Sequence, residues 1–227
     1  MKNNAMNCLP VKQAQKTLAW VVALFLATAA AKAAPDPREI MTNVREIIQA
    51  QETSVSGQLR TGAQKTPFSL KQEGGVSVYR FTSPAETIHV TFDDKGSSID
   101  GVKDPRAAIR GSILSYDDLA LRFLYWKDIQ YVGQEKIRSL PCWHLRLTPS
   151  SRASQYAIVH LWVNVQTGAF LRADAYDWEG NKVKQFQVIS TQSVGNKRFL
   201  RQMRIQNMRP SDPMAETITY LEINEAK

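Results

Sequence analysis

The sequence predicts a mainly β protein, an α+β fold in which about ten antiparallel strands form one large curved sheet or an unclosed β-barrel. Three observations lead to this prediction. From about Thr53 apolar and polar residues alternate with a period of two, and short turns rich in Gly and Pro separate the alternating segments. One aromatic segment with helical spacing interrupts them between about Asp104 and Lys127. Many short strands with short connections are typical of a curled sheet or barrel.

The predicted strands share this alternation and end at turn residues. In chain order they are Val55–Leu59, Phe68–Gln72, Val76–Phe81, Thr87–Phe92, Gln130–Ile137, Trp143–Leu147, Tyr156–Val165, Phe170–Tyr176, Val183–Ser190, Phe199–Met208 and Glu216–Ile223. Several of them carry apolar residues on both faces, which a sheet with one face in water would not need. We therefore expect the sheet to be packed on one face and covered on the other.

Residues 1–33 are expected to be a secretory signal that precedes the fold. Lysines come before an uncharged segment from Leu18 to Ala31, and the small-residue pattern Ala31-Lys32-Ala33 follows. This order is that of a cleavable signal peptide, so cleavage is predicted after Ala33, with Ala34 as the second choice. The alternative is an uncleaved membrane anchor, which the apolar segment disfavours because a span needs roughly 20 apolar residues.

Residues 34–227 are then expected to form a single domain in the periplasm, as a monomer. The signal segment carries four lysines and no acidic residue, so the net charge of +8 falls to +4 without it. A mildly basic surface whose charges alternate in sign does not indicate nucleic-acid binding. Cys142 would be the one cysteine left after cleavage, which excludes an intramolecular disulfide.

Two helical segments are expected to cover the sheet. Asp36 is a candidate N-cap for a first helix that ends near Gln51, with Pro37 in its first turn. Its apolar stripe consists of Ile40, Val44, Ile47 and Ile48. The second segment is the insert of residues 104–127, where one short helix is predicted from Asp104 to Leu114 and another from the candidate N-cap Ser115.

The second helix of the insert carries the candidate binding residues. Leu119, Phe123 and Trp126 fall at i, i+4 and i+7, and Leu124 lies beside them. Two interpretations stay open: the helix fills the core, or it is a lid whose apolar face meets a ligand cavity. Candidate cavity residues on the strands are Trp143, Trp162 and Phe170, although a one-residue error in strand register would reverse the face of each.

No catalytic, metal or cofactor site is predicted. The histidines His89, His144 and His160 have no metal-ligand spacing, and the chain contains no nucleophile elbow, phosphate loop or Cys-x-x-Cys motif. The acidic pairs are explained by turns, helix starts and a strand end. Cys142 and His144 share one face of a predicted strand, which leaves a reactive pair open as the minor alternative to a buried cysteine.

Several short segments resemble landmarks of the LolA-like outer membrane lipoprotein-sorting family. They are Ser115-Tyr116-Asp117-Asp118-Leu119, Phe123-Leu124-Tyr125-Trp126, Cys142-Trp143-His144-Leu145, Leu147-Thr148-Pro149, Trp162-Val163, Thr167-Gly168, Leu171-Arg172-Ala173, Tyr176-Asp177 and Met203-Arg204-Ile205-Gln206-Asn207. Together they extend over nearly all of the chain after the predicted signal. These motifs are structural, so the resemblance is specific for the fold and says less about the ligand.

The resemblance implies an unclosed β-barrel whose apolar concave side is covered by helices. Family members related to the periplasmic lipoprotein carrier shield acyl chains in such a cavity. It therefore implies a carrier of lipoprotein acyl chains or lipid, with an inner-membrane extraction complex and an outer-membrane receptor as partners. Arg60 is a candidate gating residue, by its location on an early strand near the lid.

A second class of function stays open beside the carrier. A non-enzymatic envelope scaffold or chaperone module would use the same fold without a lipid cargo. This alternative predicts a filled core, whereas the carrier predicts a large apolar cavity. The presence of a cavity is therefore the structural feature that discriminates between them.

Overall fold

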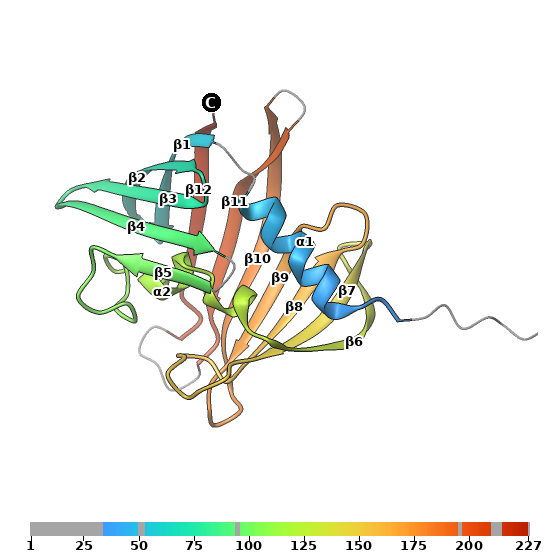
Figure 1. The fold of residues 1–227 in the computed structure, drawn as a ribbon. Coiled ribbons are helices and arrows are strands. Elements are labelled where there is room, and N and C mark those ends of the chain that lie inside the picture. Colours follow the sequence, from blue (N-terminus) through green and yellow to red (C-terminus); the bar gives the residue numbers. More distant parts are fainter. Residues whose placement is uncertain (1–33, 50–52, 94–95, 195–196, 210–214, 227) are drawn as a thin grey trace, which may run out of the picture. The chain divides into compact units, whose positions relative to one another are not determined.

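A single antiparallel sheet of twelve strands organises the chain from Thr53 onwards (Figure 1). The computed structural model describes residues 34–49, 53–93, 96–194, 197–209 and 215–226. The strands are β1 (Thr53–Thr61), β2 (Gln64–Glu73), β3 (Val76–Thr82), β4 (Ala85–Asp93), β5 (Gly96–Asp100), β6 (Asp128–Ile137), β7 (Leu140–Thr148), β8 (Ile158–Asn164), β9 (Phe170–Tyr176), β10 (Lys182–Val194), β11 (Lys197–Asn207) and β12 (Ile218–Ala226). The mainly β prediction is confirmed.

The order of strands in the sheet is β5-β4-β3-β2-β1-β12-β11-β10-β9-β8-β7-β6. Strands that follow one another in the sequence are neighbours in the sheet, with the exception of β5 and β6, and β1 pairs in addition with β12. Two meanders are thus joined along one seam, and β5 and β6 form the two outer edges. The insert connects β5 to β6, so it must pass from one edge of the sheet to the other. Topology alone therefore places the insert across a face of the sheet.

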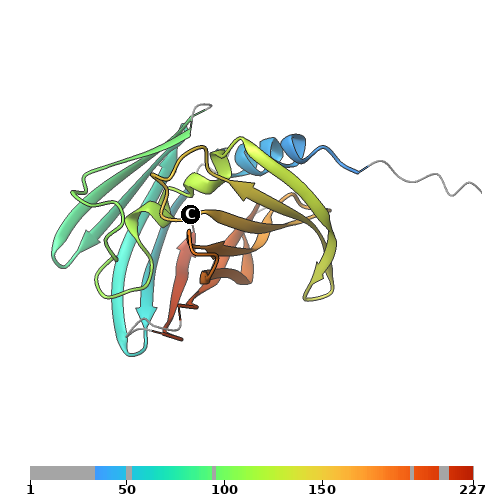
Figure 2. The same ribbon diagram turned by 90° about the horizontal axis from the view of Figure 1, so that it is seen from below.

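The sheet curves, and helix α1 (Pro37–Gln49) and the insert lie on its concave side (Figure 2). The inner face of the strands is apolar, since Leu145 and Leu147 of β7 and Val159 and Leu161 of β8 are fully buried in the core. The side chains between them face outward, as the period of two requires. The structure therefore has the predicted sheet with helical cover.

Helix α1 follows the sequence prediction closely. Its side chains Ile40, Met41 and Val44 are buried against the sheet, and the Asp36 carboxylate accepts a hydrogen bond of 2.9 Å from the backbone N–H of Arg38. The predicted end near Gln51 lies outside the described residues, which end at Gln49 in this helix.

The insert differs from its prediction. The expected helix from Asp104 to Leu114 is wrong: this segment consists of turns held by an isolated bridge between Ala108 and Ser115. The expected second helix is reduced to one α-helical turn, α2 (Tyr116–Leu119), and one 3-10 turn, η1 (Arg122–Tyr125). The break lies at Leu121, whose left-handed φ of 46° cannot continue a right-handed helix. Ser115 is the N-cap as predicted, in a capping box with Asp118.

Strand β5 was not predicted from the sequence. Its residues Gly-Ser-Ser-Ile-Asp hold a single large apolar side chain, Ile99, so no alternation marks the strand. It forms because five residues pair with β4 from His89 to Asp93. Pairing with the neighbouring strand thus stabilises an extended conformation that the local sequence does not favour by itself.

Candidate functional site

A cavity of about 650 Å³ lies between the inner face of the sheet, α1 and the insert. Most of its lining is apolar and comes from strands on both sides of the β1–β12 seam. The strand contribution includes Val55, Phe68, Leu70, Tyr79, Phe170, Phe186, Val188, Leu200, Met203, Leu221 and Ile223. Helix α1 adds Val44, Ile47 and Ile48, and the insert adds Leu114, Leu119, Leu121 and Phe123. A space of this size and composition is suited to a small apolar ligand.

Tyr79 shows how apolar the interior of the cavity is. Its ring lies 6.0 Å from that of Phe68, centroid to centroid, and both side chains line the cavity. Burial raises the pKa of Tyr79 to about 12, because a phenolate would be poorly solvated there. The cavity thus disfavours a charge at this position.

One buried polar network holds the insert against the sheet at the inner end of the cavity. The Asp118 carboxylate accepts hydrogen bonds from Lys184 Nζ at 2.7 Å, Tyr156 Oη at 2.7 Å and Gln155 Nε2 at 3.1 Å. It also accepts one from the backbone N–H of Ser115 at 2.8 Å. Burial and the neighbouring carboxylate raise the pKa of Tyr156 well above its ordinary value, so the phenol stays a donor. The charge of Asp118 is therefore matched within the protein.

The insert is also tied to the β3–β4 hairpin, through Arg110 and Tyr116. The Arg110 guanidinium donates to the backbone oxygens of Ser83 and Pro84 and to the Glu86 carboxylate, the last at 3.0 Å. The Tyr116 hydroxyl donates to the same carboxylate at 2.8 Å. Polar contacts thus hold the middle of the insert, between Arg110 and Asp118, to two different parts of the sheet.

The cavity meets solvent at one end of the sheet. Six of its lining residues are exposed, and all six belong to the turns of the β6–β7, β8–β9 and β10–β11 hairpins or to the strand ends beside them. They are Arg138, Leu140, Gln166, Thr167, Thr191 and Arg198. Consecutive hairpins of a meander place alternate turns at the same end of the sheet, so residues far apart in the sequence form one rim. We call these six residues the mouth.

The structure brings three of the sequence-predicted site residues to the cavity. Leu119 and Phe123 of the insert and Phe170 at the start of β9 line it. Phe123 also packs against Phe186, with ring centroids 6.4 Å apart.

Three other predicted residues support the core without lining the cavity. Leu124 is buried, and Trp126 and Trp143 are partly buried against the same apolar cluster. None of the three is among the residues that line the cavity.

Trp162 and Arg60 are not at the cavity, which corrects the expectation for both. Trp162 lies between the inward-facing Leu161 and Val163 on β8 and therefore faces outward, where it stacks on His144 with ring centroids 4.4 Å apart. Arg60 likewise faces outward beside the inward-facing Leu59. Alternation shows that successive side chains point to opposite faces of the sheet, but it does not show which of the two faces is the inner one. These two assignments therefore required the structure.

Arg60 instead takes part in a polar cluster on the outer face of β1, β11 and β12. Its guanidinium donates to the Glu222 carboxylate at 2.7 and 3.1 Å, and Gln58 and Gln202 donate to the same carboxylate. The hydrogen bond from Arg60, followed by those from the two glutamines, lowers the pKa of Glu222 against the opposing effect of burial.

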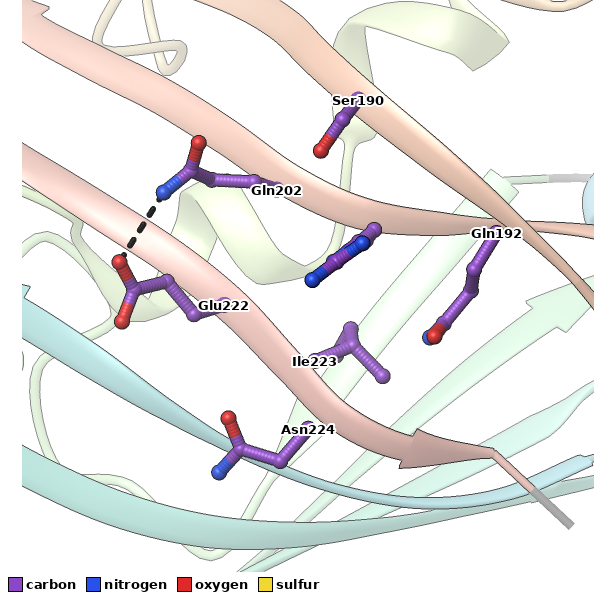
Figure 3. Close-up of a pocket in the computed structure, with 7 residues that line it drawn as sticks. Ser190, Gln192, Gln202, Glu222, Ile223 and Asn224 are labelled. Atoms are coloured by element: carbon purple, nitrogen blue, oxygen red, sulfur yellow. Dashed lines mark hydrogen bonds between the residues drawn. The ribbon is translucent and has the colours of Figure 1, made fainter.

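An outer hollow of about 500 Å³ lies beside this cluster, lined by Ser190, Gln192, Arg201, Gln202, Glu222, Ile223 and Asn224. Figure 3 shows the Gln202–Glu222 contact within it. Its one carboxylate, that of Glu222, already has three side-chain partners. The apolar cavity is the stronger candidate site.

Among the described residues, the lining of the cavity includes neither histidine nor cysteine. Within the described residues, no group of three or more His, Cys, Asp or Glu side chains could hold a metal ion. Cys142 is buried, and burial raises the pKa of its thiol, which opposes the thiolate that a nucleophile needs. The ring nitrogens of His144 are engaged by Glu135 and His160, at 2.8 and 2.7 Å. Sequence reasoning left a Cys142–His144 pair open, and the structure gives both residues other surroundings.

Several cavity residues were not singled out from the sequence. Val188, Leu200, Met203 and Leu221 lie on β10–β12 within ordinary alternating segments. Alternation predicts that they share a face with other apolar residues, but not that this face borders an open space.

No helix among the described residues has both the length and the apolar character needed to cross a bilayer.

Comparison with known proteins defines the fold class. A DUF1329 family protein from Desulfovibrio piger is 20% identical, with a TM-score of 0.64 over 85% of this chain and 93% of that one. A LolA superfamily protein from Nitrosomonas europaea is 17% identical, with a TM-score of 0.63 over 86% of this chain and 94% of that one. A putative outer membrane lipoprotein-sorting protein domain from Vibrio parahaemolyticus is 12% identical, with a TM-score of 0.66 over 85% and 93% of the two chains.

The protein therefore has a LolA-like fold, an open antiparallel sheet with helical cover. Residues 94–227 match the model of a protein family whose description reads "Uncharacterized protein", and the chain belongs to that family. No curated protein matches the sequence.

Proposed function

We propose that this protein is a non-enzymatic carrier of the periplasm that shields acyl chains of lipoproteins or lipids in its apolar cavity. The observation that carries this proposal is the cavity itself, about 650 Å³ of space lined mainly by apolar side chains. A scaffold that borrows the fold would have no need to leave such a space open. The LolA-like fold supports the proposal in general terms.

The cavity offers a physical reason for reversible binding. Removing an acyl chain from water is worth roughly 0.8 kcal/mol for each CH2 group, so even a medium chain gains considerable free energy. The lining combines residues from the sheet, α1 and the insert, and it includes Met203, whose flexible side chain adapts to irregular ligands. A broad apolar surface of this kind favours a range of chain lengths over one tightly fitted ligand.

Entry through the mouth does not require the insert to move. The middle of the insert is tied to the sheet by the pairs Asp118–Lys184 and Arg110–Glu86. We therefore propose the insert as a fixed wall that presents Leu119 and Phe123 to the cargo. The lid of the initial hypothesis becomes part of the cavity wall in this proposal.

The more specific role that we propose for this carrier is the sorting of lipoproteins to the outer membrane. It would require an inner-membrane complex that supplies the cargo and an outer-membrane receptor that accepts it. The likeness in fold to a lipoprotein-sorting domain supports this role, and the predicted signal at residues 1–33 supports the compartment.

Filling the cavity tests the carrier proposal. Leu70 lines the cavity and is half-buried, whereas its neighbour Ser69 is exposed on the opposite face of β2. We expect Leu70→Trp to weaken binding of a fluorescent fatty-acid probe about tenfold or more, because the larger side chain occupies the space of the acyl chain. The matched control Ser69→Trp should bind as the wild type does, and both variants should give wild-type circular dichroism.

Native mass spectrometry of gently purified protein provides a second readout. A bound lipid or lipoprotein that is retained in Ser69→Trp and lost in Leu70→Trp would support the carrier. Failure of the wild-type protein to take up any acyl probe would contradict it and favour a scaffold or chaperone role.

A further inference from the structure

The mouth of the cavity differs in charge from its interior. Of the six residues that form it, Arg138 and Arg198 are cationic, and no acidic side chain among the described lining residues lies there. The one acidic lining residue, Asp118, is at the insert and is paired with Lys184. The described lining thus combines an apolar interior with a positively charged rim.

Arg138 is held in position by two features of the chain. It occupies the two-residue β6–β7 turn with Ser139, and both residues have a positive φ, 49° and 69°, as a tight hairpin of this kind requires. Its Nη1 donates to the backbone oxygen of Ile189 in β10 at 2.8 Å. A guanidinium has five N–H donors, so this contact anchors the group and leaves others for a ligand.

Arg198 reaches the mouth through an irregularity in the β10–β11 pair. The register shifts between Val188 and Ser190 and again between Ser190 and Thr191. Beyond these shifts strict alternation no longer holds, and Arg198, Phe199 and Leu200 all line the same cavity as Met203. Such bulges re-aim side chains near functional sites.

The two arginines are close enough to serve one head group. Arg138 contacts Ile189, and Arg198 pairs with Ser193, four residues further along β10. At about 3.3 Å per residue this separation is roughly 13 Å along the strand, which long side chains can narrow. Within the described part of the chain, Arg198 has no ion-pair partner.

We infer that the cargo is an anionic amphiphile whose acyl chain fills the cavity and whose carboxylate or phosphate lies at the mouth between Arg138 and Arg198. This inference rests on the proposed carrier function and specifies its ligand. Guanidinium groups bind carboxylate and phosphate with charge-assisted hydrogen bonds, which gives the mouth its selectivity. The acyl chain supplies the affinity and the head group sets the orientation.

Competition binding with the purified protein tests this inference. A neutral environment-sensitive dye would be displaced by dodecanoate, dodecyl phosphate or uncharged dodecanol at low ionic strength. We expect each anionic compound to bind about tenfold more tightly than dodecanol, with the difference shrinking at high salt because exposed charges are screened. Comparing dodecanoate with dodecyl phosphate identifies which head group is preferred.

The double variant Arg138→Gln/Arg198→Gln should bind dodecanol as the wild type does and lose the preference for anions. Arg201→Gln is the matched control, because Arg201 is an exposed arginine of the same strand that lines the outer hollow and not the cavity. It should keep the preference. Arg198→Lys should retain most of it, since the charge remains.

The outcomes separate the two proposals. Equal binding of dodecanol and both anions by the wild type, or an equal loss of preference in Arg201→Gln, would overturn the inference and leave the carrier function standing. Failure of all three compounds to displace the dye would overturn the carrier function itself. Loss of the anion preference in the mouth variant alone would support the inference.

Discussion

At the scale of single residues, the position of a side chain on one or the other face of a strand decides its role. Trp162 has the size and apolar character of a cavity residue, but it faces outward and stacks on His144. Its indole N–H donates to Glu135 at 2.9 Å, and Arg172 lies over its ring, 4.8 Å from the centroid. Trp162 therefore belongs to a polar and aromatic cluster that covers the outer face of β6–β9.

A carboxylate stabilises the same outer cluster. Asp174 is buried, which tends to raise the pKa of its side chain, but hydrogen bonds from Arg172, Lys182 and Gln185 outweigh burial and keep the pKa below its ordinary value. Asp174 thus stays ionised at neutral pH. The outer face is held together by charge and hydrogen bonds, whereas the inner face is held by apolar packing.

A histidine in this cluster gives stability a defined pH dependence. Burial, followed by the nearby His144 and Arg146, lowers the pKa of His160, while Asp174 and Glu135 oppose the shift. The unfolded chain therefore takes up a proton near pH 6.5 that the folded protein resists. Stability should fall as the pH drops through 6.5 towards the lowered pKa, by less than about 1 kcal/mol because the ring is only partly buried.

Urea unfolding at pH 7.5 and 5.5 checks this prediction. His160→Gln should lose less stability between the two pH values than the wild type does. His89→Gln, at an exposed position on β4, should keep the full wild-type difference. An unchanged pH dependence in His160→Gln would show that other groups are responsible.

At the scale of elements, the insert contains little regular secondary structure, and its conformation depends on its contacts with the sheet. Its α-helical part is a single turn, and isolated turns of this length are not stable by themselves. The Asp118 side chain has no exposed surface, and its Oδ2 lies 2.7 Å from Lys184 Nζ of β10. This buried ion pair fixes the insert where it forms the cavity wall.

Removal of the charge on Asp118 should be costly. Asp118→Asn would leave the largely buried Lys184 without its counter-ion, and we expect a loss of about 3–5 kcal/mol in the free energy of unfolding. Its neighbour Asp117 pairs with the exposed Arg122, so Asp117→Asn should cost under about 1 kcal/mol. Denaturant titration of both variants measures this difference, and similar losses would contradict the assigned role of the buried pair.

At the scale of the described domain, the pairing of β1 with β12 joins two meanders into one sheet. The two strands are separated by most of the chain, and cavity residues come from both meanders, for example Phe68 and Tyr79 from one and Phe186 and Met203 from the other. The cavity therefore depends on the seam. A register shift between Ser56 and Gly57 marks the point where the seam is least regular.

Gly57 should be sensitive to substitution because the two strands approach closely there. A Cβ atom at this position would lie 2.4 Å from the backbone oxygen of Glu222. We expect Gly57→Ala to lower stability by about 1–3 kcal/mol and to increase hydrogen exchange in β1 and β12. Gly133, at which a Cβ atom would meet nothing within 4 Å, provides the control, and Gly133→Ala should change stability by less than about 0.5 kcal/mol. Equal effects of the two substitutions would argue against a strained seam.

Local signals in the sequence predicted much of this domain. The predicted strand Phe170–Tyr176 coincides with β9, and the N-cap at Ser115 is present. The prediction of the insert helices was wrong because apolar spacing and candidate caps do not report a left-handed residue such as Leu121, which tertiary contacts impose. Strand β5 was missed because its existence depends on the edge of β4.

The sequence by itself determined the fold class, the covered inner face and the segments that supply the cavity wall, because alternation and helix caps are local properties. The tertiary structure decided which face Trp162 and Arg60 occupy and how Arg138 and Arg198 come to share one rim. The physical reason for the first is that a period of two does not say which face of the strand is the inner one. The reason for the second is that bulges and hairpin ends from distant segments meet only when the whole sheet has assembled.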